Sequence, residues 1–296
     1  LFLRCTNEKP ECRFTSEELY INYFKFFYNV PLKNMNIKEM IDKLFCESME
    51  DPKMQFELAK MYEDGIHIER NINKAIYYYS QASEQNHSEA QLNLALIYEK
   101  GKYIKRDMKK SVYYYTLAAN QNNVIAQNNL GTIYTDGDDG IPPDSNKAKY
   151  YFSLAANQNY REAQFNLGTC YELQRDFEKA FYYYKLAADQ NLPSAQNNLA
   201  VFYHKGYYVS QDIEKAIHYY SLAAEQNYPS SQAVLGYFYL KGEYVEGDIN
   251  KALKYLELAA NGNDYDAQYN LGLLYYNNKY IKRNIYSKWS KCNRRG

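Results

Sequence analysis

One block of residues recurs seven times along this chain, at intervals of 32 to 37 residues, and it limits the possible folds more than any other feature. Each copy has a glutamine, a leucine three residues later, then glycine or alanine, and a tyrosine three residues after that. The glutamines are Gln55, Gln91, Gln127, Gln164, Gln196, Gln232 and Gln268. Such a period indicates that each copy is one small structural unit that has to stack on its neighbours.

A second block follows after a short loop and reads Lys-Ala-x-x-Tyr-Tyr-x-x-Ala-Ala or a close copy. It begins at Lys74, Lys147, Lys179, Lys215 and Lys251. In both blocks the apolar and small residues recur every three or four positions, which is the spacing of one face of an α-helix. Each repeat is therefore expected to be helix A, a loop and helix B. The small residue after the leucine lets the two backbones approach closely.

Residues at the expected helix ends agree with this interpretation. An Asn or Asp three residues before the lysine position predicts the N-cap of helix B. These residues are Asn71, Asp107, Asp144, Asp176, Asp212 and Asp248. A glycine follows helix A in most copies and predicts its C-cap. Because one helical hairpin cannot bury its apolar face, the sequence predicts an all-α, right-handed α-solenoid of about seven repeats over residues 51–283.

These repeats resemble the Sel1-like repeat family, a relative of the tetratricopeptide repeat, from about residue 53 to residue 280. The resemblance implies a scaffold or adaptor that holds other proteins together and has no chemistry of its own. Family membership also leaves open an adaptor role in ER-associated degradation. An ER-lumenal protein would be expected to carry a glycan at Asn86, in the triplet Asn86-His87-Ser88.

The two ends of the chain depart from the repeat. Residues 1–50 are expected to form a separate helical segment, which either caps the first repeat or is part of another domain. Residues 1–20 resemble the end of a protein kinase C-lobe and match it at Cys5, Arg13, Thr15 and Glu18. That resemblance implies an alternative function as the C-terminal regulatory or substrate-docking region of a kinase. Residues 284–296 are expected to be a frayed basic tail.

Charge and motif content argue against several functional classes. The 35 basic and 35 acidic residues balance, whereas proteins that coat nucleic acid carry an excess of Lys and Arg. No apolar run approaches the ~18 residues of a membrane span. The sequence has no Gly-rich phosphate loop, no nucleophile elbow and no histidine pair with metal-ligand spacing. We therefore expect no catalytic site, cofactor or metal, and five scattered cysteines favour the reducing cytoplasm.

The expected binding surface follows from analogy with tetratricopeptide stacks, where helices A line a concave groove. An asparagine stands directly before the Leu-Gly or Leu-Ala pair in five copies, as Asn93, Asn129, Asn166, Asn198 and Asn270. Its amide could clamp the backbone of a bound peptide, or it could bond a neighbouring helix. Phe165, Tyr237 and Tyr269 are the predicted anchors. Since this lining has almost no Lys or Arg, the expected ligand is a neutral, partly apolar, extended segment of another protein.

Overall fold

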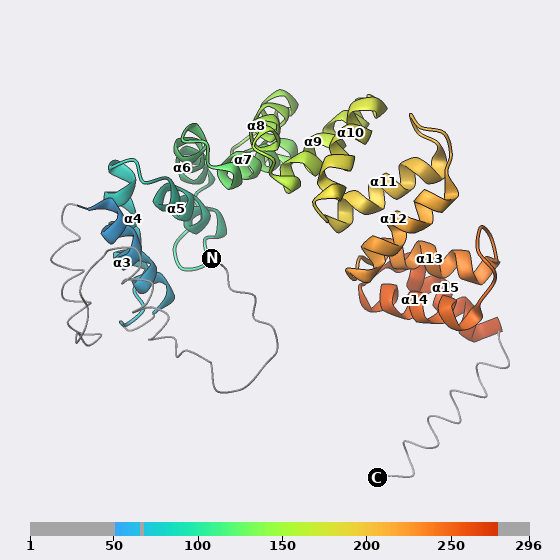
Figure 1. The fold of residues 1–296 in the computed structure, drawn as a ribbon. Coiled ribbons are helices and arrows are strands. Elements are labelled where there is room, and N and C mark those ends of the chain that lie inside the picture. The colour runs from blue at the N-terminus through green and yellow to red at the C-terminus, as the bar shows by residue number, and fades with distance from the viewer. Residues whose placement is uncertain (1–50, 66–67, 278–296) are drawn as a thin grey trace, which may run out of the picture. The chain divides into compact units, whose positions relative to one another are not determined.

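The computed structural model describes residues 51–65 and 68–277 (Figure 1). Over these ranges it contains thirteen α-helices of 13 residues each, which alternate between helix A and helix B of successive repeats. Helices A are α3 (Pro52–Asp64), α5 (Ser88–Lys100), α7 (Val124–Asp136), α9 (Arg161–Leu173), α11 (Pro193–Lys205), α13 (Pro229–Lys241) and α15 (Tyr265–Asn277). Helices B are α4 (Ile72–Glu84), α6 (Met108–Asn120), α8 (Ser145–Asn157), α10 (Phe177–Asp189), α12 (Ile213–Glu225) and α14 (Ile249–Asn261).

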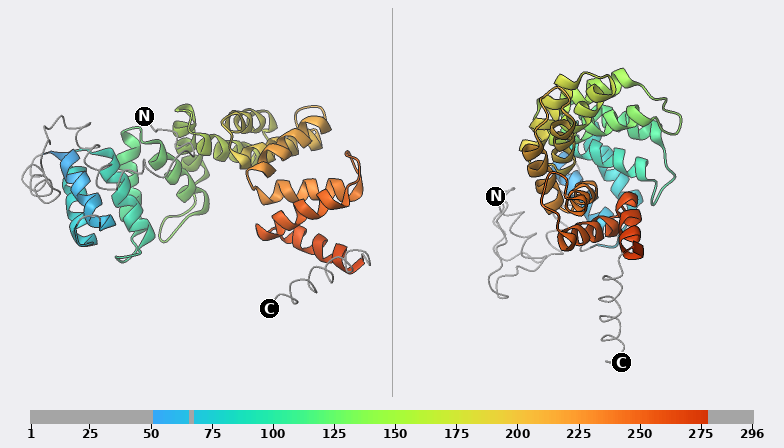
Figure 2. Two further views of the ribbon diagram at one scale, coloured as in Figure 1. Left: turned by 60° about the horizontal axis from the view of Figure 1, so that its bottom comes forward. Right: turned by 90° about the vertical axis from the view of Figure 1, so that its right-hand side faces the viewer.

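The chain divides into two compact units, Leu1–Gln121 and Asn122–Gly296. In each unit the helices of one repeat pack as a pair, and the next pair packs on the first. Figure 2 shows this clearly for α13, α14 and α15, which lie side by side at the orange-to-red end of the second unit. The all-α architecture is thus confirmed for the described residues. The predicted N-terminal helical segment and basic tail fall outside the described ranges.

The helix ends follow the capping chemistry that the sequence predicts. Each of the six Asx residues before helix B caps its helix. Oδ1 of Asp107, for example, accepts a hydrogen bond from the backbone N–H of Lys110 at 3.0 Å. Gly101 ends α5 in the left-handed conformation, with φ 58°. Repeat four has no glycine at this place, and Arg175 adopts the positive φ instead. A local Asx residue therefore defines the start of each of the six helices B.

The turn from helix B to the next repeat depends on an asparagine that the sequence reasoning overlooked. One asparagine at each of these turns has φ between 61° and 63°. These residues are Asn86, Asn122, Asn159, Asn191, Asn227 and Asn263. Asn tolerates the left-handed region better than other residues with a side chain, because its short amide can bond locally. Its place in this turn explains why an asparagine stands at position 86, and this explanation does not involve a glycan.

A small residue on helix A meets a large one on helix B at the centre of each repeat. A methyl group added to Gly131 would lie 2.4 Å from the ring of Phe152, and one added to Gly168 would lie 2.8 Å from the ring of Tyr184. Such distances are well inside van der Waals contact, so the paired helices can approach this closely only with glycine there. We call this contact line between helices A and B the seam.

The lysine and tyrosines of the second block build one stacked group per repeat. In repeat two the rings of Tyr98 and Tyr114 are 5.9 Å apart and nearly parallel, and Nζ of Lys110 lies 4.9 Å from the Tyr98 ring. The other five pairs of helices A and B repeat this arrangement. Stacking and cation–π attraction thus explain why these residue types recur.

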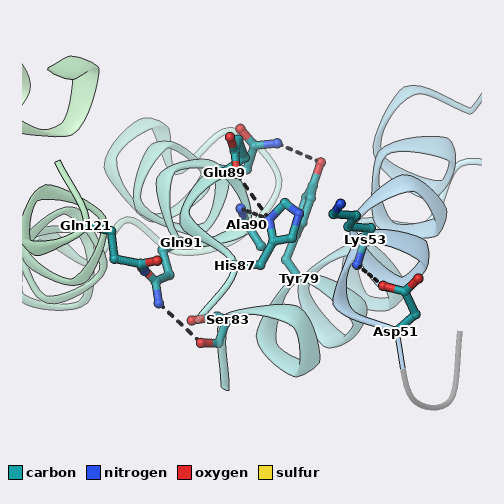
Figure 3. A network of polar contacts seen from close by, with 10 residues as sticks. Asp51, Lys53, Tyr79, Ser83, His87, Glu89, Ala90, Gln91 and Gln121 are labelled. Atoms are coloured by element: carbon teal, nitrogen blue, oxygen red, sulfur yellow. Dashed lines mark hydrogen bonds and ion pairs between the residues drawn. The ribbon is translucent and has the colours of Figure 1, made fainter. Parts of the chain in front are cut away.

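The recurring glutamine joins one repeat to the next. Nε2 of Gln91 donates to the carbonyl oxygen of Ser83 at 3.2 Å, and Nε2 of Gln121 donates to Oε1 of Gln91 at 2.6 Å (Figure 3). The bond to Ser83 joins two repeats, whereas the bond from Gln121 ties helix A to the end of helix B within one repeat. Glutamine pairs of the second kind recur between Gln55 and Gln85 in the first unit and three more times in the second. A buried amide has to be satisfied, and here its partners fix the stacking of repeats within each unit.

Candidate peptide-binding site

A hollow of the second unit lies against helices A of repeats five, six and seven. It has a volume of about 640 Å³ and is lined by residues of α11, α13, the loop after α13, and α15. We call it the aromatic pocket. Its lining residues are His204, Lys205, Ser230, Ala233, Val234, Tyr237, Phe238, Glu243, Tyr244, Asp264, Asp266, Tyr269 and Asn270. This volume falls within the range of ordinary ligand pockets.

Two tyrosines give the aromatic pocket its accessible apolar surface. Tyr237 on α13 is 37% exposed and Tyr269 on α15 is 68% exposed. Asp266, Tyr269 and Asn270 stand at helical positions i, i+3 and i+4, so one face of α15 presents all three to the pocket. Three predicted site residues, namely Tyr237, Tyr269 and Asn270, are therefore brought together at one place.

The back wall of the pocket is a packed aromatic cluster. His204, in the last turn of α11, meets the rings of Phe238 and Tyr244 edge-on at centroid distances of 5.3 and 5.6 Å. Tyr244 has a φ of 65°, an uncommon conformation for a large side chain, which carries local backbone strain. Burial lowers the pKa of His204, Lys205 lowers it further, and Glu243 opposes them. The imidazole is therefore neutral at pH 7.

Carboxylates dominate the charge of the aromatic pocket. Glu243, Asp264 and Asp266 line it together with a single ammonium group, that of Lys205. Oδ1 of Asp264 accepts a hydrogen bond from the backbone N–H of Ala267 at 2.9 Å, so this residue also caps α15. The sequence predicted a neutral lining because only positions on helices A were taken into account. Loops and helix N-caps bring these acidic groups to the pocket.

A smaller hollow of about 210 Å³ lies in the first unit and has the opposite charge. Arg70, Lys100 and Lys102 line it, with Glu63 as its acidic group. We call it the basic hollow. The guanidinium of Arg70 lies 4.2 Å from the ring of Tyr103, which stands in the loop after α5. A hydrogen bond from Lys102 and the charge of Arg70 lower the pKa of Tyr103.

The predicted clamp asparagines are half-buried and make contacts within the protein. Nδ2 of Asn93 donates to the hydroxyl of Tyr79 at 3.0 Å, and Asn93 also lines the basic hollow. Asn198 bonds the hydroxyl of Tyr184 in the same way. Since an amide has two N–H donors and an acceptor oxygen, one such bond does not use up its capacity. An asparagine in this slot can therefore contact a neighbouring helix and still have hydrogen-bonding groups left for the backbone of a bound peptide.

The other predicted site residues lie apart from the aromatic pocket. Nδ2 of Asn166 donates to Oδ1 of Asn128 at 2.9 Å, and Asn129 is half-buried on α7. The ring of Phe165 is half-buried and packs 5.6 Å from that of Tyr184, as part of the core. Phe165 therefore offers a ligand less surface than Tyr237 or Tyr269 does.

Three of the four buried tyrosines of helix B have acidic partners that the sequence reasoning missed. The hydroxyl of Tyr79 donates to Glu63 at 2.8 Å, and that of Tyr184 donates to Glu172 at 2.5 Å. Tyr115 and Glu99 form the third such pair. A signal was available, because the glutamate always stands eight residues after the recurring glutamine. In the repeats whose helix B carries Phe152, Tyr220 or Leu256, the residue at this position is Thr135, His204 or Leu240, respectively.

Comparisons with known proteins agree with the fold. The model of the Sel1 repeat matches seven consecutive segments between residues 52 and 287, leaving out residue 265 alone. A Sel1 repeat protein from Oxalobacter formigenes has a similar structure, with 26% identity, a TM-score of 0.70, and coverage of 86% of this chain and 75% of that one. No curated protein matches the sequence significantly.

A second similar structure is c5321, a protective antigen of uropathogenic Escherichia coli that displays an SLR fold. Its identity is 27% and its TM-score 0.72, with 79% of this chain covered. The chain spans 51% of the length of that antigen. These matches confirm the α-solenoid, while its predicted handedness stays a prediction.

Two structural observations bear on chemistry. Among the described residues, no group of three or more His, Cys, Asp or Glu side chains could hold a metal ion. None of the helices described is both long and apolar enough to cross a membrane. Sel1 repeat proteins generally mediate interactions between proteins, and their solenoid is typically a non-catalytic scaffold. Because the seven matches span most of its length, this chain belongs to the Sel1 repeat family.

Proposed function

We propose that this protein is a non-catalytic scaffold that binds an extended segment of another protein in the aromatic pocket. One observation carries the proposal: exposed Tyr237 and Tyr269 and the amide of Asn270, from successive helices A, surround a hollow of about 640 Å³. Large aromatic side chains that become buried supply much of the binding energy at protein interfaces. Asn270 would pair with the backbone of the bound segment, since its amide both donates and accepts.

The remaining features of the proposal follow from the sequence. Asn93, Asn129, Asn166 and Asn198 occupy the same slot as Asn270 and stay predicted ligand contacts. Phe165 stays a predicted anchor, but it should contribute less binding energy because its ring packs in the core. The cytoplasm is the proposed location. The proposal of a reducing compartment follows from the five scattered cysteines of the sequence.

The test is a selection of random twelve-residue peptides displayed on phage, with the full chain as the target. Selected peptides are synthesised with a fluorescent label, and their affinity is measured by anisotropy. Tyr269→Ser should weaken binding about tenfold or more, because it removes an aromatic anchor. Tyr182→Ser is the matched control, since Tyr182 is 56% exposed in the same unit but lies on helix B outside the pocket.

Two outcomes would contradict the proposal. The selection could enrich no peptide above an unrelated helical protein, or Tyr182→Ser could weaken binding as much as Tyr269→Ser. Circular dichroism of each variant shows whether the helices are intact, so that a loss of binding can be assigned to the missing ring.

A further inference from the structure

Lysine side chains of helix B lie beside a recurring pair of groups, a tyrosine ring of helix A and a carboxylate. Nζ of Lys215 lies 2.9 Å from Oδ2 of Asp212 and 5.2 Å from the centroid of the Tyr203 ring. Lys179 has the same two neighbours in repeat four. A cation is attracted both by the face of an aromatic ring and by the negative charge beside it.

A loop tyrosine also receives a guanidinium in the first unit. Tyr103 stands two residues after Gly101, and Arg70 of the preceding repeat lies 4.2 Å from its ring. Tyr244 stands at the same place in repeat six, two residues after Gly242. Its neighbour from the preceding repeat is His204, at 5.6 Å, in place of an arginine.

The aromatic pocket combines these features around an open volume. Tyr237, Tyr244 and Tyr269 supply the rings, and Glu243 and Asp266 supply carboxylates that form no ion pair within the described part of the chain. Two cations of the chain lie nearby. Lys205 lines the pocket, and Nζ of Lys241 is 5.7 Å from the Tyr237 ring. With His204 neutral at pH 7, the three carboxylates of the lining outweigh its one ammonium.

We propose that the aromatic pocket receives a cationic side chain, an arginine above all, from the bound segment of the partner protein. This inference rests on the proposed function and specifies its ligand. The planar guanidinium stacks on a tyrosine ring while its N–H groups reach carboxylates at the ring's edge, which a lysine ammonium does less well. The bound segment is thus partly apolar and carries positive charge, which refines the neutral ligand expected from the sequence.

The difference in charge between the basic hollow and the aromatic pocket supports a cationic ligand for the aromatic pocket. In the basic hollow the ring of Tyr103 is already covered by Arg70, and the lining is rich in cations. In the aromatic pocket the corresponding ring of Tyr244 has a neutral imidazole beside it and carboxylates around it. An arginine from a partner would complete in the second unit the contact that the chain completes by itself in the first.

The test uses the peptides selected on the full chain. We expect a basic residue, flanked by apolar residues, at one fixed position of the enriched sequences. Replacing that arginine with citrulline keeps the shape of the side chain and removes its charge. This replacement should weaken binding about tenfold, because the peptide loses a cation–π contact and the attraction of a carboxylate. The preference for arginine should shrink as salt is raised from about 0.05 to 0.5 M, because salt screens exposed charges.

Variants locate the effect in the pocket. Asp266→Asn combined with Glu243→Gln should reduce the preference for arginine over citrulline to less than about threefold, since both carboxylates are removed at constant shape. Glu225→Gln is the control, because Glu225 is exposed on α12 outside the pocket. Asp264 is left unchanged because it caps α15.

The outcomes separate the inference from the proposed function. Peptides that need Tyr269 but bind equally well with citrulline would overturn the inference and leave the scaffold function in place. A selection without any peptide that depends on Tyr269 would overturn both. If a synthetic peptide of residues 278–296, which has seven basic and no acidic residues, alone binds the pocket, the occupant is this chain and not a partner. If concentrating the protein alone blocks the pocket by self-association, the occupant is a second copy.

Discussion

The seams between paired helices and the surface around the aromatic pocket are built on different principles. In the seam similar residue types return from repeat to repeat, because each position meets a similar neighbour: a glycine or alanine meets a large side chain, and in three repeats a tyrosine meets a glutamate. Around the two hollows the corresponding positions differ in charge and exposure. The comparison indicates that packing determines the residue types of the seam, whereas the residues around the hollows can differ from repeat to repeat.

High pH should separate the two regions most strongly. Burial raises the pKa of Tyr79 and Tyr184 far above the ordinary value of 10, and the pKa of Tyr220 to about 12. These seam phenols stay protonated when the same residues ionise in the unfolded chain. Stability is therefore fully present below pH 10 and falls as pH rises above it. The loss should be about 1 kcal/mol per tyrosine between pH 10 and pH 11, because the tyrosine of the unfolded chain is already half ionised at pH 10.

Tyr220→Phe gives the cleanest control for this prediction, because burial alone raises the pKa of Tyr220. Urea unfolding at pH 10 and pH 11, followed by circular dichroism, should show a loss smaller by about 1 kcal/mol in the variant than in the wild type. An equal loss in both proteins would mean that Tyr220 is not held in its neutral form.

Close packing at the seam predicts a loss of stability from one added methyl group. Gly131→Ala should lower the free energy of unfolding by about 2 kcal/mol, since the new carbon would lie 2.4 Å from the Phe152 ring. Gly272→Ala in α15 should instead raise it by up to about 1 kcal/mol, because no described atom lies within 4 Å of that position and alanine favours the helix. Equal gains at both sites in urea unfolding would show that α7 and α8 can separate at no cost.

Removing one partner of a tyrosine–glutamate pair should lower the stability by less, and a second substitution should reverse the loss. Tyr184→Phe should lower stability by about 1 kcal/mol, because the carboxylate of Glu172 loses its hydroxyl donor. Adding Glu172→Thr copies the Phe152 and Thr135 pair of repeat three and should recover most of the loss. A double-mutant cycle in urea measures this coupling. If the two effects simply add, the glutamate does not act through the tyrosine.

The comparison also explains what could be predicted from the sequence. The helices, their caps and the small residue of the seam depend on neighbours within one repeat, so the period and local chemistry were sufficient. Asn86 and its equivalents show a limit, because the left-handed turn gives no periodic apolar signal. Tyr244 and Glu243 show another, since a loop's conformation decides whether its residues face helix A. The pocket required the relative placement of three repeats.

The most direct test of the central claim is to find where a bound peptide contacts the chain. Tyr269 and, separately, Tyr182 are replaced with the photoreactive amino acid p-benzoylphenylalanine, and each protein is irradiated with a selected peptide and then analysed by mass spectrometry. The account predicts efficient cross-linking from position 269 and little from position 182, which lies outside the aromatic pocket. Cross-linking from position 182 with none from position 269 would contradict it and would place the partner on helices B.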